Sequence, residues 1–148
     1  MTVSAAEGYS NPLRGGFLDS MPTLPWTSGP YVDDAPLHVL TSTLPLNRYL
    51  DVPRFLHWTL KIRKQLRDAP GLAGYSLDAR LPHKTFWTLS AWQDREAMEQ
   101  FVRSGAHAAM LADMAGRLGP SRFVESTAAR ADLPLDWSAA RQRVGNAD

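Results

Sequence analysis

A histidine at the start of an apolar helical stripe is the residue best suited to acid–base chemistry in this sequence. His107 follows Ser104-Gly105, a pair that favours a break between two helical segments. The apolar residues that share its predicted helical face are Met110, Leu111, Met114 and Leu118. Burial and the positive end of a helix both favour the neutral imidazole, which can accept a proton as a general base. The alternative is a histidine that only hydrogen-bonds the helix break.

Four aromatic side chains could line a pocket beside such a base: Trp58, Tyr75, Trp87 and Trp92. The phenol of Tyr75 can donate a hydrogen bond to an oxygen of a bound molecule, whereas the tryptophans offer flat apolar walls. Aromatic residues at this spacing are also common core residues, so a structural role stays open for each. Side chains alternate across a strand, so Trp87 and Trp92 must point to opposite faces. We expect Trp87 to face the helices, with the opposite register as the alternative.

The other titratable residues form no recognisable site. His38, His57 and His83 are widely spaced, so no short metal-ligand motif is present and we expect no metal site. The sequence has no cysteine, which excludes disulfides and a thiol nucleophile. It also lacks a glycine-rich phosphate loop and a nucleophile elbow.

From residue 37 onward the sequence predicts a regular order of elements to position these residues. The predicted elements are strands over 37–44, 72–80, 86–92 and 122–130, a helix over 51–69, a broken helical region over 94–118 and a short terminal helix over 133–144. Strand, helix, strand, strand, helix, strand is the ferredoxin-like α+β arrangement, in which two helices cover one face of a four-stranded antiparallel sheet. The other face would then be bare in a monomer, and a face-to-face homodimer would cover it.

The first 36 residues form an arm in our interpretation. They contain five prolines and four glycines and show no sustained periodicity. Their apolar residues, among them Phe17, Met21, Trp26 and Tyr31, favour packing over the core or a partner subunit, with a lid over a pocket as the alternative. We therefore divide the chain into an arm (1–36), a core domain (37–132) and a C-terminal extension (133–148).

Composition narrows the function classes. The 148 residues are 44% hydrophobic and 21% charged, as expected of one globular domain, and the net charge of +1 gives no reason to expect nucleic acid as a partner. No apolar run is long enough to span a membrane, and the first 20 residues lack the features of a signal peptide. We expect a soluble, cytoplasmic protein that has no membrane partner.

The segment from the aromatic strand into the second helix resembles antibiotic biosynthesis monooxygenase-like members of the dimeric α+β barrel superfamily. The residues that carry the resemblance are Trp92, Asp94, Glu96, Ala97, Met98, Phe101, Ser104, Ala106 and His107. Such proteins often show an aromatic strand end, acidic residues, an Ala-aromatic pair and a final Ser, small residue, His. The motif is more specific for the fold than for the activity, because the superfamily also includes haem-binding proteins, dehydratases and isomerases.

The resemblance implies a homodimer with a hydrophobic pocket between sheet and helices in each subunit. Cofactor-independent oxygenases of this type bind an aromatic or polyunsaturated small molecule there, assist its deprotonation and let the anion react with dioxygen. In that hypothesis His107 accepts the proton, Tyr75 donates a hydrogen bond and Trp87, Trp58 and Trp92 form walls. A non-catalytic ligand-binding or assembly module is a further alternative.

Haem is the other cofactor that the resemblance raises. Haem-degrading relatives combine a first-strand Asn with a Trp and a His on the second helix. Aligned without gaps, the Trp position falls on Phe101 and the His position on Leu111, so these two residues are also candidates for the pocket wall. His107 lies one turn earlier, yet it could serve as an axial ligand if haem is bound.

Overall fold

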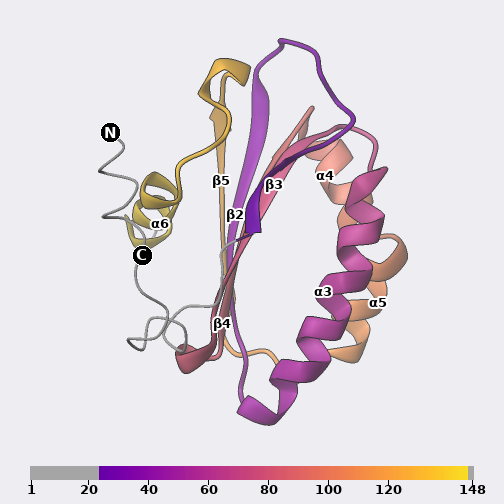
Figure 1. Cartoon of the computed structure of the whole chain (residues 1–148), viewed down its shortest axis with the longest axis vertical. Coiled ribbons are helices and arrows are strands. Elements are labelled where there is room, and N and C mark those ends of the chain that lie inside the picture. Colours follow the sequence, from indigo (N-terminus) through magenta and orange to yellow (C-terminus); the bar gives the residue numbers. More distant parts are fainter. Residues whose placement is uncertain (1–23, 147–148) are drawn as a thin grey trace.

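Helices cover both faces of a single antiparallel sheet (Figure 1). The computed structural model describes residues 24–146. The strands are β1 (Leu24–Ser28), β2 (Leu37–Pro45), β3 (Leu72–Arg80), β4 (Thr85–Trp92) and β5 (Arg122–Ala128), in the spatial order β1-β3-β4-β2-β5. The helices α3 (Val52–Arg67), α4 (Arg95–Val102) and α5 (Gly105–Asp113) cover one face, and α6 (Trp137–Asn146) covers the other. The short 3-10 turns are η2 (Tyr49–Asp51), η3 (Leu81–His83) and η4 (Arg130–Asp132).

The ferredoxin-like prediction is confirmed, with one strand more than expected. The order of β2, α3, β3, β4, the α4–α5 pair and β5 is the predicted one, and every strand pair is antiparallel. The predicted helix break is also present, because α4 ends at Val102 and α5 begins at Gly105, whose φ is 56°. No helix within residues 24–146 is long and apolar enough to cross a membrane.

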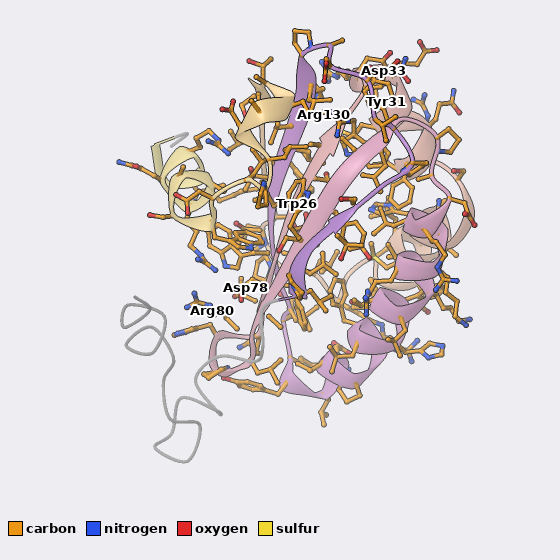
Figure 2. The ribbon with its side chains drawn as sticks, turned by 45° about the horizontal axis from the view of Figure 1, so that its top comes forward. Trp26, Tyr31, Asp33, Asp78, Arg80 and Arg130 are labelled. Atoms are coloured by element: carbon orange, nitrogen blue, oxygen red, sulfur yellow. The ribbon has the colours of Figure 1, made fainter. Side chains whose placement is uncertain are left out.

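Part of the predicted arm is the fifth strand. Strand β1 pairs with β3, and Trp26 packs on Gly74, where an added Cβ would lie 2.4 Å from the indole nitrogen. A glycine is needed there because any larger residue would displace the ring. Figure 2 shows Arg130 close to Tyr31 and Asp33, and its guanidinium donates to both backbone carbonyls, at 2.6 and 2.8 Å. The sequence did not reveal β1 because it is short and contains a proline.

Alternation along the strands separates two layers of apolar side chains. The layer under α3, α4 and α5 includes Leu66, Tyr75, Trp92, Phe101 and Met110. The layer on the α6 side includes Leu37, Val39, Leu89, Ala91 and Ala140. A bulge between Leu72 and Gly74 shifts the register of β3, so Ala73 joins the α6 layer while Tyr75 faces the helices.

The second face of the sheet is not bare. Residues from α6 and the segment before it, among them Leu133, Leu135, Trp137 and Ala140, pack on it together with Trp26 and Tyr31. The expectation that a partner subunit must cover this face was therefore wrong, because the chain supplies its own cover. The homodimer itself stays a prediction.

Candidate functional site

A cavity of about 410 Å³ lies between the sheet and the helices α3, α4 and α5. Its apolar lining residues are Leu40, Leu44, Ile62, Leu66, Leu77, Leu89, Trp92, Met98, Phe101, Val102, Met110, Leu111, Leu118 and Phe123. Its polar lining residues are Ser42, Tyr75, Thr88, Ser90, Glu99, Arg103, His107, Ser121 and Glu125. The volume and the mainly apolar walls are typical of sites for small hydrophobic molecules. Side chains alone do not fill this space, contrary to what a purely structural core would require.

His107 lines this cavity as a half-buried side chain. Its Nδ1 lies 3.2 Å from the carbonyl oxygen of Val102. A carbonyl can only accept a hydrogen bond, so Nδ1 carries the proton and the neutral ring keeps its lone pair on Nε2. Burial lowers the pKa of His107 below its ordinary 6.5, against the smaller opposite effect of the bond to Val102. The imidazole is therefore neutral at physiological pH, with Nε2 able to accept a proton.

Three of the candidate wall residues reach the cavity. Trp92 and Phe101 are buried, and their ring centroids are 5.2 Å apart. Leu111 on α5 is 43% exposed and lines the cavity near Phe123 of β5, which is 61% exposed. Apolar side chains that are exposed in this way beside a cavity mark the side from which a hydrophobic ligand can enter.

Two predicted wall residues do not line the cavity. Trp87 lies on the α6 side of β4, with its ring centroid 5.4 Å from the guanidinium of Arg141. The expectation that Trp87 faces α3 and α5 was wrong, and the alternative register holds, because Trp92 takes the inward position. Trp58 instead joins α3 to the end of α5, where its indole donates to Asp113 at 2.7 Å. It packs against the core beside the cavity and is absent from the lining.

Hydroxyl groups from three adjacent strands form part of the floor of the cavity. Ser42 of β2 is directly opposite Thr88 of β4, and Ser90 of β4 is directly opposite Tyr75 of β3. The indole of Trp92 donates to Ser90 Oγ at 2.8 Å. Tyr75 is buried, and its hydroxyl accepts a hydrogen bond from Arg63 Nε at 3.4 Å. Each hydroxyl keeps a proton that it can donate to an oxygen of a bound molecule.

Charged residues gather at one end of the cavity. Glu125 Oε1 lies 2.6 Å from His38 Nε2 and 3.4 Å from Arg95 Nε. The same Arg95 nitrogen contacts Glu99 at 3.0 Å. Arg103 is a further lining residue. Because three charged side chains line the cavity, two of them acidic, the lining is not a cationic anion trap. Among residues 24–146, no three His, Asp or Glu side chains converge as ligands for a metal ion.

Sequence reasoning missed the hydroxyl floor and the His38–Glu125 pair. The hydroxyl residues were visible as Ser42 on the inward face of the first predicted strand, and as Thr88 and Ser90 in the aromatic strand. They could have been selected once the inward face of β4 was known, because residues two apart share a face. The His38–Glu125 pair had no such signal, since it depends on the side-by-side register of β2 and β5.

No protein-family model matches the sequence, and no curated protein matches it. Solved structures match the fold. A structure from Fusobacterium nucleatum, named provisionally as a monooxygenase, matches with a TM-score of 0.58 and 9% identity over 73% of this chain and 52% of its own. Two structures named provisionally as antibiotic biosynthesis monooxygenases also match. The one from Nitrosomonas europaea has a TM-score of 0.56 and 13% identity over 67% of this chain and 95% of its own. The one from Caulobacter crescentus has a TM-score of 0.55 and 16% identity over 62% of this chain and 89% of its own.

This chain has the fold of these monooxygenase-named structures. The match covers 95% and 89% of the two shorter structures, whereas the chain spans about half the length of two longer ones, from Fusobacterium nucleatum and Lactobacillus acidophilus. The resemblance in residues 92–107 therefore led to the right fold. At these identities the likeness carries the fold alone, and the activity must be argued from the cavity.

Proposed function

We propose that this protein is a monooxygenase-like enzyme that acts on a hydrophobic aromatic or polyunsaturated small molecule without a bound cofactor. The observation that carries the proposal is the contact of His107 Nδ1 with the Val102 carbonyl oxygen at 3.2 Å, which leaves Nε2 free of that contact in a mainly apolar cavity. A neutral imidazole with an available Nε2 is suited to remove a proton from a weakly acidic C–H or O–H group. Apolar walls favour a substrate that releases water on binding.

The proposed reaction balances without an external reductant. His107 removes a proton from a CH₂ group, and the resulting carbanion transfers electrons to dioxygen to form a carbon–oxygen bond. The protonated imidazole returns its proton to the peroxide anion, and loss of water then leaves a carbonyl. One oxygen atom enters the product, the other leaves as water, and the substrate itself supplies the electrons.

The hydroxyl floor supports the same proposal. Removal of a proton from a phenol or an activated CH₂ group places negative charge on an oxygen of the substrate. Ser42, Thr88 and Tyr75 line the cavity and can donate hydrogen bonds to that oxygen. In a water-poor site, donors already held in place by the sheet stabilise such charge better than mobile water does.

Haem fits this cavity poorly. His107 could present Nε2 to an iron, because its Nδ1 is bonded to Val102. The charged residues that line the cavity are, however, two glutamates, Glu99 and Glu125, and one arginine, Arg103, which is a poor set of partners for the two carboxylates of haem. Arg95 already contacts both glutamates. This charge arrangement favours an uncharged hydrophobic molecule over haem, so our proposal includes no haem.

Dioxygen uptake with anthrone, a tricyclic molecule with an acidic CH₂ group, tests the proposal. We expect the parent protein to convert anthrone to anthraquinone and water faster than buffer does, and His107→Ala to lose about 10²-fold in rate. His57→Ala is the matched control, because His57 is exposed on α3 and absent from the cavity lining. Equal rates for the parent and a folded His107→Ala protein would argue against His107 as the base, and a parent rate no faster than that in buffer would argue for a non-catalytic ligand-binding role.

A further inference from the structure

The N-terminus of α5 is not capped by its own N-cap residue. Ser104 occupies the N-cap position with an extended backbone, but its side chain makes no capping bond to α5. Its hydroxyl turns back and donates to the carbonyl oxygen of Gln100 in α4 at 2.7 Å. The first amide groups of any helix lack partners within that helix, so the start of α5 needs another acceptor.

Gln65 of α3 provides that acceptor. Its Oε1 accepts a hydrogen bond from the backbone amide of His107 at 2.8 Å. Its Nε2 donates to the carbonyl oxygens of Ser104 at 2.9 Å and Phe101 at 3.3 Å. One amide side chain therefore bonds backbone groups on both sides of the break between α4 and α5, using its acceptor and its donor together.

Gly105 leaves room for this arrangement. A Cβ added at Gly105 would lie 3.0 Å from Gln65 Cδ and 3.1 Å from its Nε2. The φ of Gly105 is also 56°, in the left-handed region that glycine tolerates best. The sequence pair Ser104-Gly105 thus opens the break, and Gln65 from a different helix determines its shape.

We propose that Gln65 is the positioning residue for His107: its amide holds the break between α4 and α5 so that the imidazole faces the cavity with Nδ1 on Val102. The inference rests on the proposed function for its catalytic meaning. The effect of Gln65 on the position of His107 does not depend on that function, because Gln65 contacts the backbone of His107 directly and does not line the main cavity. A glutamine suits this role because its amide offers an acceptor for His107 and a donor for Ser104 on two separate atoms.

Loss of Gln65 should change the surroundings of His107 in a defined direction. Without the amide, the break can open and water can reach the imidazole, so the pKa of His107 should rise toward 6.5 as its burial decreases. The charged side chains lining the same cavity are Glu99 and Arg103 at the end of α4 and Glu125 of β5. From α3, Ile62 and Leu66 line it, so no α3 charge in the lining obscures the change.

Nuclear magnetic resonance of the full chain tests this inference without any substrate. The variants are Gln65→Met, which removes both halves of the amide, and Gln65→Glu, which keeps an acceptor for His107 but removes the N–H donors. Gln100→Met is the matched control, because Gln100 is exposed and the amide and ring of His107 bond to Gln65 and Val102 instead. We would measure hydrogen exchange at the His107 amide and the titration of its ring, assigned with His107→Ala.

We expect amide exchange at His107 to be at least 10-fold faster in Gln65→Met, also faster than in the parent in Gln65→Glu, which loses the donors to Ser104 and Phe101, and unchanged in Gln100→Met. The ring of His107 should titrate at higher pH in Gln65→Met. Parent-like exchange and titration in a folded Gln65→Met protein would overturn the inference. If Gln65→Met does not fold, parent-like exchange at the His107 amide in Gln65→Glu would overturn it equally, because that variant lacks the N–H donors to Ser104 and Phe101. Neither result depends on turnover, so failure of the proposed function would be seen separately, in the anthrone assay.

Discussion

The imidazole of His107 meets the ring of Phe101 edge to face, with centroids 5.3 Å apart and planes inclined at 61°. Phe101 in turn packs against Trp92 of β4. Three aromatic rings therefore connect the start of α5 to the end of the central strand β4 along the cavity wall. A planar hydrophobic molecule in the cavity should contact Trp92, whereas Trp87 on the same strand lies on the far side of the sheet.

This arrangement predicts which tryptophan reports binding. Titration with 2-naphthol should quench part of the intrinsic fluorescence of the parent protein, because Trp92 lines the cavity. Trp92→Phe should lose most of this response, while Trp87→Phe should keep it. A response that disappears with Trp87 instead would show that the molecule binds on the α6 side.

The pH dependence of turnover follows from the lowered pKa of His107. The base must be neutral, so the acid limb of the rate profile should have its midpoint below pH 6.5, the ordinary value for histidine. The related stability effect has a defined sign: the unfolded chain takes up the proton first as pH falls. The contribution of neutral His107 to the free energy of unfolding is fully present above pH 6.5 and is lost as pH falls toward the pKa of His107 in the folded state. His107→Gln should lack this component in pH-dependent denaturation curves.

Trp58 should matter for stability and little for binding. Its indole donates to Asp113, which also pairs with Arg54 at 3.0 Å, so this contact ties α3 to the end of α5. The Trp58 hydrogen bond is the main cause that lowers the pKa of Asp113, with Arg54 next. Trp58→Phe should lower the Tm by about 2 to 4 °C, as expected for one hydrogen bond in a domain of this size. Calorimetry and the 2-naphthol titration would check both parts, and weaker binding without a change in Tm would contradict this assignment.

The contacts of α6 with the sheet predict a larger effect. Arg141 pairs with the buried Asp78. Arg80 also contacts Asp78, at 2.9 Å (Figure 2). The guanidinium of Arg141 lies near the rings of Trp87 and Trp137. Arg141→Met would leave Asp78 with less compensation, at a cost of about 3 kcal/mol in unfolding free energy. The double variant Arg141→Met, Asp78→Asn should recover part of this loss. Urea denaturation measures both, and additive losses would show that the pair is not coupled.

The backbone pattern was predictable because it depends on periodicity within short segments. Strand β3 and the break at Ser104-Gly105 lie where the sequence places them, and α3 (Val52–Arg67) lies within the helix predicted over 51–69. Asp51 precedes α3, but its carboxylate makes no capping bond and pairs with Arg48 and Arg117 instead. The pairing with Arg117, 66 residues away, leaves no local pattern in the sequence.

The site was only partly predictable for the same reason. His107 could be placed on an inward face from its apolar neighbours, and the structure puts it in the cavity lining. The choice between Trp87 and Trp92 depended on which face of β4 meets the helices, and apolar content alone could not decide this because α6 also buries the other face. Gln65 gave no signal, since its partners lie 36 to 42 residues away in the chain.

Chemical rescue of a His107→Gly protein tests the central claim most directly. If the imidazole of His107 removes the proton, anthrone turnover should fall by about 10²-fold in His107→Gly and should recover when free imidazole is added, because the cavity can then take up the missing base. Imidazole should leave the parent rate unchanged. Parent-like turnover in His107→Gly without imidazole would contradict the account, because the cavity would then act without this base.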